Sequence, residues 1–408
     1  MSESINENRR ERAIHIGINY GSTDSELNGC VSDSVNLLAL SIKLGIDDLV
    51  LGIDVDIDDP DLSEKTIVPS FEILMNNKDN ITTFWPTKLN ILKEIVKAVE
   101  DDNIASLFLT YSGHGASGQP SSSNTEESDL IDEYMCTLGN DGEFEGTYES
   151  FISDDELFET INNASQNRTT PIVITFVFDC CHSGTIFDLP YGMRKINNNI
   201  EFTMQPENSA DLNDLVVISG WSGCQDVQYS YENYNDANDM VEGVCTHGFL
   251  KAADDLDIFD LSKEINQFDI TLSMANNMFA IDNFEDADVD VSKKYQVMNH
   301  SSSIDIGPVG TSNIISQKFV VGRANNMDLN ETHVRIVLDQ SDYDYLEIID
   351  HRVESEHNTD GEEQEDVDDN DNNETDNIDD SDDDFDGPDD DEDEDEDDKK
   401  NKCRCIII

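Results

Sequence analysis

The feature that most constrains the fold is the unbroken apolar run Ile172–Phe178 (IVITFVF). It is rich in β-branched residues, which is typical of a strand in the middle of a parallel sheet that is covered on both faces. Other short apolar runs predict strands at Arg12–Tyr20, Leu49–Ile53, Ile81–Trp85, Leu107–Tyr111 and Leu215–Ser219. Helical spacing of apolar residues predicts helices at Asp33–Leu44, Leu89–Val99 and Asp154–Asn163. Strands that alternate with helices predict a layered α/β fold with a mainly parallel sheet.

Charge is distributed unevenly along the 408 residues, which include 91 acidic and 24 basic side chains. Residues 354–398 contain 28 acidic residues and no Lys or Arg, so they lack the apolar mass that would offset the entropy of ordering. Residues 1–353 still carry a formal charge of −43. This charge excludes nucleic-acid binding through phosphate contacts, and it favours cationic partners such as metal ions or basic side chains of a substrate.

The sequence contains no signal for secretion and none for a membrane-spanning helix. The N-terminus lacks the basic and apolar regions of a secretory signal, and no apolar run is long enough to span a bilayer. Eight cysteines in such a chain predict reduced thiols in the cytosol.

Composition divides the chain into five expected segments. They are a short N-terminal piece (1–12), a main globular unit (13–306), an appended β-rich segment with β-like runs at Phe319–Val321 and Val334–Val337 (307–353), a disordered acidic linker (354–398) and a basic C-terminal segment (399–408).

Two of the predicted strands end in polar clusters that contain a histidine and cysteines. Leu107–Tyr111 runs into Ser112–Gly115 (SGHG) and then a polar loop of about 40 residues, the length of a functional loop, and Ile172–Phe178 runs into Asp179–Gly184 (DCCHSG). Ligands of open α/β sheets bind at the carboxyl ends of the strands, so the two clusters are expected to meet over one cleft. An imidazole beside a thiol helps to activate it and later protonates the leaving amine.

Each member of this pair also has an ordinary structural interpretation. Cys181 alone is most simply a buried small hydrophobic residue, and His114 alone a hydrogen-bonded loop histidine. Their joint occurrence at two strand ends, each beside Gly and Ser, favours the catalytic interpretation. Glycines next to the histidine let a substrate backbone approach and can aim N–H groups at a developing oxyanion.

The residues around this pair resemble the catalytic boxes of the metacaspases, which are caspase-like cysteine endopeptidases. The likeness covers roughly residues 13–306, in order, and is carried by Leu27–Asp33, Tyr111–Gly115, Asp179–Tyr191, Ser222–Gln228 and Tyr295–Ser303. It implies a caspase-like three-layer α/β/α sandwich, closer to type I than to type II members, and a monomer. One segment departs from the family pattern: Gln228–Glu232 reads QYSYE where the family commonly has Gln-Thr-Ser-Ala-Asp. This departure concerns the details of the substrate cleft.

The resemblance assigns catalytic roles residue by residue. It implies that Cys181 is the nucleophile and His114 the general acid and base, with an oxyanion hole formed by the N–H groups of Gly115 and Cys181. Cys180 and His182 are alternatives to Cys181, but adjacent side chains on a strand point to opposite faces, so they are not expected to share its role.

The same resemblance implies that Asp33 and Asp179 line the primary substrate pocket, with Cys30 and Ser112 beside them. Two carboxylates in a cleft attract Lys or Arg before the scissile bond and repel Asp, and the planar fork of Arg can bind carboxylates bidentately. Asp33 also has a structural interpretation that is compatible with this role, as the N-cap of the helix that it begins.

Calcium is the expected cofactor by resemblance, because many metacaspases need it, and no organic cofactor is implied. The matching ligands are Asp132, Asp154, Asp155 and Asp188, and hard oxygen donors suit Ca²⁺. The alternative is that these four residues are solvated surface in a very acidic chain. The loop Asp54–Asp58 superficially resembles an EF-hand, but Asp59 and Lys65 stand where that loop needs Gly and Glu, so it is rejected.

The end of the sequence carries a separate signal. Cys405–Ile408 fits a prenylation box, Cys403 is available for palmitoylation, and basic residues stand just upstream at Lys399, Lys400, Lys402 and Arg404. The acidic linker would then act as an extended tether, although its charge is repelled by anionic lipid. The alternative is that Cys405–Ile408 is an apolar end of the sequence that is not lipidated. The expected location is the cytoplasm, with membrane association through the prenyl group.

The sequence therefore predicts a calcium-stimulated cysteine endopeptidase that cleaves protein substrates after Arg or Lys. If it processes itself, Arg194 or Lys195 is the expected position. The rival hypotheses are a catalytically silent caspase-like scaffold and an acidic calcium-binding protein that acts through its tail.

Overall fold

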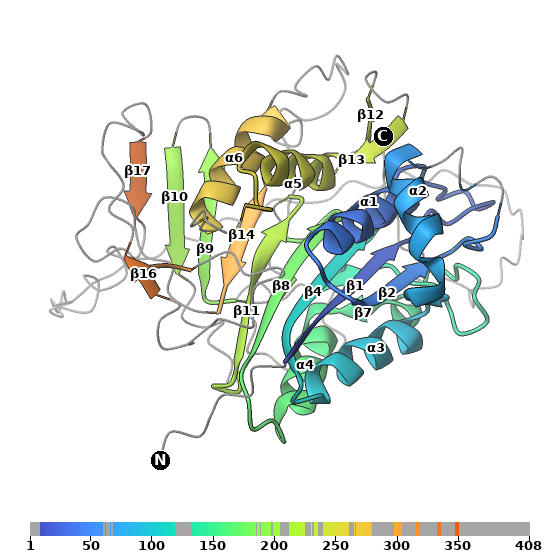
Figure 1. Ribbon diagram of the computed structural model, residues 1–408, viewed down its shortest axis with the longest axis horizontal. Coiled ribbons are helices and arrows are strands. Elements are labelled where there is room, and N and C mark those ends of the chain that lie inside the picture. The colour runs from blue at the N-terminus through green and yellow to red at the C-terminus, as the bar shows by residue number, and fades with distance from the viewer. Residues whose placement is uncertain are drawn as a thin grey trace, which may run out of the picture.

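The computed structural model describes the chain from residue 9 to residue 350 with gaps (Figure 1). The described residues are 9–59, 62, 66, 68–118, 132–184, 186–187, 189–196, 199–204, 212–224, 230, 232–235, 240–260, 265, 267–279, 298–303, 315–317, 333–335 and 347–350. Within them, no helix is both long enough and apolar enough to cross a bilayer. The acidic linker and the lipidation signal lie outside the described residues.

A ten-stranded sheet forms the centre of the molecule, in the order β17-β10-β9-β14-β11-β8-β4-β1-β2-β3. Its parallel part consists of β1 (Arg10–Gly17), β2 (Asp48–Ile53), β3 (Ile81–Phe84), β4 (Ile104–Ser112), β8 (Ile172–Asp179) and β11 (Val216–Ser222). Beyond β11 the pairing becomes antiparallel through β14 (Asn299–Ser302), β9 (Tyr191–Ile196) and β10 (Asn199–Met204), and β17 (Glu347–Asp350) pairs parallel with β10. The predicted mainly parallel sheet is confirmed.

Helices cover both faces of this sheet, as Figure 1 shows. One face carries α1 (Cys30–Lys43), α2 (Val68–Asn77), α5 (Val244–Asp255) and α6 (Gln267–Phe279), whose apolar side chains join one core cluster. The other face carries α3 (Lys88–Glu100) and α4 (Asp154–Ser165), which contribute to a second cluster. The result is the expected α/β/α sandwich.

Strand β8 shows why the apolar run of the sequence is unbroken. All eight of its residues are buried. Phe176 and Phe178 pack in one core cluster, whereas Val177 packs in the cluster on the opposite face. Burial of each large side chain contributes about 1.5–3 kcal/mol, so a strand covered on both faces has little room for polar residues.

Several elements differ from the sequence-based expectation. The long polar loop after β4 contains a small sheet made of β5 (Gly115–Gly118), β6 (Asp132–Met135) and β7 (Ile152–Ser153). A short hairpin, β12 (Glu232–Asn235) and β13 (Met240–Gly243), precedes α5. In the appended segment, β15 (Ile315–Gln317) pairs with β16 (His333–Arg335), and the predicted run Phe319–Val321 lies outside the described residues.

Candidate active site

The two predicted catalytic segments leave the same edge of the sheet. Strands β4 and β8 are parallel neighbours in which Ser112 pairs with Asp179, and the Gly113 N–H donates to the Asp179 carbonyl at 3.2 Å. His114 and Cys181 each stand two residues beyond this pair. The topology therefore brings together two residues that are 67 positions apart in the sequence.

His114 is held firmly in a buried position. Its Nε2 lies 2.8 Å from the carbonyl oxygen of Ser25, and because a carbonyl only accepts, the ring proton is on Nε2. The ring also lies against Tyr20, with centroids 4.6 Å apart, and the His114 backbone N–H donates to the Tyr20 hydroxyl. Nδ1 is buried and has no hydrogen-bond partner among the described residues. In the neutral ring, this nitrogen is the one able to accept a proton.

Cys181 lies where the backbone of the histidine segment touches the β8 segment. A Cβ atom built on Gly115 would come within 1.8 Å of the Cys181 carbonyl oxygen, so only glycine permits this approach. The Cys181 thiol donates to the Ser230 carbonyl at 3.7 Å. Immediately afterwards, His182 adopts a left-handed conformation with φ 52°. The two N–H groups expected to form the oxyanion hole, those of Gly115 and Cys181, thus belong to adjoining backbones.

Cys180 occupies a different environment from Cys181. It belongs to the core cluster that contains Phe178 and Phe187, and burial raises the pKa of its thiol well above the ordinary value. A thiol that resists ionisation is a poor nucleophile. This placement favours Cys181 as the nucleophile.

The four residues predicted for the primary pocket lie together between α1, β4 and β8. Asp33 accepts a hydrogen bond from the Ser112 hydroxyl at 2.7 Å and from the Gly243 N–H at 3.1 Å. Asp179 accepts from the Thr246 N–H at 2.8 Å and from the Ser230 hydroxyl. A Cβ atom on Gly243 would approach both carboxylates, within 2.3 Å of Asp179 and 2.6 Å of Asp33. The two acids therefore converge on one glycine.

Burial dominates the electrostatics of this pocket. It raises the pKa of Asp33 well above the ordinary value, and the nearby charge of Asp179 raises it further. Burial likewise raises the pKa of Asp179. Within the described part of the chain, no Lys or Arg forms an ion pair with either carboxylate.

The pocket also contains residues to which sequence reasoning gave no role. Glu232 accepts hydrogen bonds from the Asn28 and Gly29 N–H groups and lies 3.6 Å from the Cys30 sulfur. Burial first, and then the charge of Glu232, raise the pKa of Cys30 well above the ordinary value. Ser230 and Glu232 both belong to the segment that departs from the family pattern, and that departure was the available signal.

The interpretation of Asp33 as a helix N-cap is wrong. Helix α1 begins at Cys30, its N-cap is Gly29, and no side chain caps it. Asp33 lies inside the first turn and points its carboxylate at Ser112 and Gly243 instead. The sequence placed the helix start three residues late, because the small residues before Asp33 carry no strong helical signal.

The expected calcium ligands are only partly brought together. Asp154 accepts from the Glu133 N–H at 3.2 Å, and burial, with the charge of Asp132 as a further cause, raises its pKa to about 6. Asp155 follows at the start of α4, and Asp188 lies outside the described residues. Among the described residues, no three His, Cys, Asp or Glu side chains form a set able to hold a metal ion.

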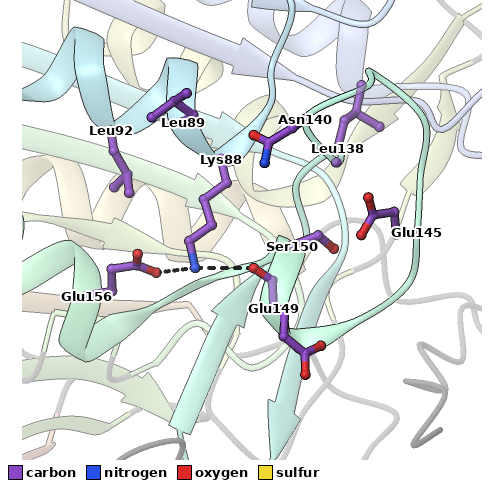
Figure 2. A pocket seen from close by; sticks show the side chains of 10 residues that line it. Lys88, Leu89, Leu92, Leu138, Asn140, Glu145, Glu149, Ser150 and Glu156 are labelled. Atoms are coloured by element: carbon purple, nitrogen blue, oxygen red, sulfur yellow. Dashed lines mark hydrogen bonds and ion pairs between the residues drawn. The ribbon is translucent and has the colours of Figure 1, made fainter.

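A separate pocket of about 410 Å³ lies on the face of the sheet that α3 and α4 cover, between α3 and the segment that follows β6 (Figure 2). It is lined by Lys88, Leu89, Leu92, Leu138, Gly139, Asn140, Glu145, Glu149, Ser150 and Glu156. Lys88 forms an ion pair with Glu156 at 2.6 Å across this pocket. None of the predicted site residues lines it, and it holds no thiol or imidazole, so it is not the catalytic cleft.

Comparisons with known proteins agree with this geometry. Residues 11–190 match the family described as metacaspase, peptidase C14 domain, and this region contains Asp33, His114 and Cys181. Metacaspase-5 of Trypanosoma cruzi is 30% identical over 219 residues, which cover 52% of this chain and 42% of that protein. Metacaspase-2 of Trypanosoma brucei brucei is 29% identical over 237 residues, covering 56% of this chain and 58% of that protein.

A fungal metacaspase is also similar to this chain. Metacaspase-1 of Saccharomyces cerevisiae (strain ATCC 204508 / S288c) is 31% identical over 183 residues, covering 45% of this chain and 35% of that protein. The chain thus spans between about a third and three fifths of the length of these three relatives. Sequence boxes, sheet topology and family match coincide on the same residues, and residues 11–190 are similar to the metacaspase peptidase C14 domain.

Proposed function

We propose that this chain is a cysteine endopeptidase that uses Cys181 and His114. The observation that carries the proposal is the state of His114. Its Nε2 is committed to the Ser25 carbonyl, its Nδ1 is buried without a hydrogen-bond partner among the described residues, and its segment lies against the backbone of Cys181. Buried polar side-chain atoms are usually hydrogen-bonded. Among the described residues, His300 Nδ1 is also unpartnered, so the contact with the Cys181 segment is what distinguishes His114.

The proposed reaction follows from this arrangement. Nδ1 of His114 takes the thiol proton, and the Cys181 sulfur attacks the carbonyl carbon of the scissile bond. The N–H groups of Gly115 and Cys181 stabilise the oxyanion of the tetrahedral intermediate. The imidazolium then protonates the leaving amine, which leaves a thioester. A water molecule, deprotonated by His114, hydrolyses the thioester and releases the acid product.

We propose further that the substrate carries Arg or Lys before the scissile bond. Asp33 and Asp179 are two buried acceptors without an ion pair in the described residues, and both carboxylates face the same glycine. A guanidinium or ammonium group would supply the missing positive charge. An aspartate side chain would add a third negative charge to a site where two already repel each other.

The decisive experiment uses paired reporter peptides that differ only in having Arg, Lys or Asp before the reporter. Wild-type protein is expected to release the reporter after Arg and Lys but not after Asp, and Cys181→Ala is expected to be inactive. The matched control is Cys180→Ala, which removes the neighbouring thiol and should retain turnover in its folded fraction. Cleavage after Asp, or turnover that survives in Cys181→Ala, would contradict the proposal.

We also propose that the protein binds calcium. The buried carboxylate of Asp154 lies close enough to Asp132 for the charge of Asp132 to raise its pKa, and carboxylate oxygens are ligands that Ca²⁺ prefers, with Asp155 and Asp188 as the further ligands implied by family resemblance. Titration calorimetry should show Ca²⁺ binding that Asp154→Asn weakens at least about tenfold. Asp141→Asn, an exposed acid in the same loop region, serves as the control. Equal affinities in the two variants would exclude Asp154 as a ligand.

Two processing steps remain proposals. Self-cleavage after Arg194 or Lys195 would require β9 to leave the sheet, because it pairs with β10 on one side and β14 on the other. Prenylation of Cys405, with palmitoylation of Cys403 as the second anchor, would attach a cytoplasmic protein to membranes. Intact-mass measurement of the protein purified from eukaryotic cells tests both steps.

A further inference from the structure

The catalytic histidine depends on a loop from the other side of the cleft, residues 18–29, which connects β1 to α1. The Ser25 carbonyl accepts the Nε2 proton of His114. The Tyr20 hydroxyl accepts from the His114 backbone N–H at 2.8 Å and donates to the Cys136 carbonyl at 2.7 Å. The loop therefore fixes both the ring orientation and the tautomer of His114.

The backbone of this loop adopts unfavourable dihedral angles at two residues. Tyr20 has φ 53° and Ser22 has φ 64°, both in the left-handed region that non-glycine residues rarely adopt. Such conformations are unfavourable and persist only when their surroundings enforce them. Some other part of the molecule must therefore hold the loop in place.

Asp54 provides such a contact. It stands just after β2, and its Oδ1 accepts from the Asn19 N–H at 3.0 Å while its Oδ2 accepts from the Tyr20 N–H at 2.7 Å. The side chain is half-buried, and burial raises its pKa even though these backbone N–H groups stabilise the charged form. One carboxylate thus fixes two consecutive peptide groups at the start of the strained turn.

We propose that Asp54 is a positioning residue for catalysis, which acts through Tyr20 and Ser25 to hold His114 in its working orientation and tautomer. The inference rests on the proposed peptidase function and deepens it by adding a remote residue to the machinery. The substrate pocket has its own bonds, from Ser112 and Gly243 to Asp33, and these do not pass through Asp54. Loss of Asp54 should therefore affect turnover more than substrate binding.

The chemistry of the contact makes a carboxylate necessary. The Asn19 and Tyr20 N–H groups face different oxygen atoms of Asp54, so both oxygens are used as acceptors, and the Gly21 N–H also stabilises the carboxylate. Asparagine has the same shape but replaces one oxygen with an NH₂ group, which would face an N–H donor. Asp54→Asn must therefore release either Asn19 or Tyr20.

The test compares Asp54→Asn with Asp56→Asn in the full chain. Asp56 is an exposed acid in the same loop, and its side chain accepts from the Asp58 N–H rather than from the loop that holds His114, so it is a matched control. Asp54→Asn is expected to lower kcat about 10- to 100-fold with KM for an Arg peptide changed less than about threefold, because small misplacements of a catalytic group cost that much. Asp56→Asn should match wild type.

A second readout does not depend on peptide hydrolysis. The rate of Cys181 alkylation by iodoacetamide, followed by peptide mass spectrometry across pH, reports how strongly His114 assists thiol ionisation. In Asp54→Asn this profile should shift to higher pH, whereas a loss of stability alone would change the folded fraction and not the midpoint. A double-mutant cycle with Tyr20→Phe should give effects on the alkylation rate that are less than additive, since both changes act on one path.

The outcomes separate the two hypotheses. If wild type does not cleave peptides but the alkylation profile still shifts in Asp54→Asn, the peptidase proposal fails and the positioning role stands. If Asp54→Asn and Asp56→Asn share the kcat and alkylation profile of wild type, the positioning role is overturned. Should Asp54→Asn not fold, Asp54→Glu keeps both acceptors one methylene further out, and a shift of its alkylation profile decides in the same way.

Discussion

At the scale of single residues, the site contains two carboxyl groups whose burial lowers the stability of the substrate-free protein. Asp33 and Asp179 are buried close to each other, and the described residues supply them with hydrogen bonds but no ion pair. Two buried acids that lie close together favour their protonated forms. Keeping their ionised forms buried at neutral pH therefore destabilises the folded state. The cost is consistent with a site prepared for a cationic side chain.

Replacement of Asp33 by Asn should therefore stabilise the free protein. The pKa of Asp33 is raised in the folded state, so the folded protein holds a proton that the unfolded chain releases, and stability falls as pH rises from about 4 to that raised pKa. Asp33→Asn removes this loss. We expect a gain of about 1 kcal/mol or more at pH 7.5 and a smaller gain at pH 5, with a loss of activity on Arg peptides.

Chemical denaturation at the two pH values measures this effect. The control is Asp24→Asn, an exposed acid in the neighbouring loop, which should be neutral at both. An Asp33→Asn protein that is less stable than wild type at pH 7.5 would show that hydrogen bonding by the carboxylate outweighs its burial cost.

At the scale of elements, each site residue is positioned by the end of a strand or helix. His114 and Cys181 follow β4 and β8, Asp33 lies in the first turn of α1, and Gly243 ends β13. Helix α4 similarly begins beside the proposed calcium ligands. Its N-cap is Ser153, whose hydroxyl accepts from the Glu156 N–H at 3.1 Å.

Removal of this cap should weaken the start of α4. Ser153→Ala is expected to lower the free energy of unfolding by about 1 kcal/mol, the usual cost of losing a hydroxyl N-cap. Ser153→Thr retains the hydroxyl and should lose only a few tenths. Urea denaturation followed by circular dichroism distinguishes the two variants, and equal stabilities would show that the Glu156 N–H finds another acceptor.

At the scale of the whole molecule, the proposed machinery lies within residues 19–246. Residues 354–398 contain 28 acidic side chains, and none of the residues proposed for the site belongs to this segment. Deletion of residues 354–408 should therefore leave kcat/KM on a short soluble Arg peptide within about twofold of wild type at 0.15 M salt, where a charge more than about 8 Å away is screened. A tail-driven function would instead be lost with the deletion. Peptide hydrolysis and lysate fractionation, compared for both forms, separate these cases.

Much of the fold followed from local pattern. The β-branched run at Ile172–Phe178 and the alternation of strands and helices were sufficient for a parallel sheet with helices on both faces. The small sheet of β5, β6 and β7 was not predicted, because short polar strands that pair across a long insertion have no periodic apolar signal. Helix α2 was missed for a related reason: it is a short helix in a part of the chain with weak amphipathic spacing.

What the sequence by itself determined is the set of chemical groups and the edge of the sheet at which they stand. Motifs around His114, Cys181, Asp33 and Asp179 are local, so they can be recognised in one dimension. Only the tertiary structure decided which partners complete them: the Ser25 carbonyl, Glu232 and Asp54 reach the site from distant segments. A backbone carbonyl can come from any residue type, and an acid in a chain with 91 of them carries no positional signal, so these contacts exist only once the chain has folded.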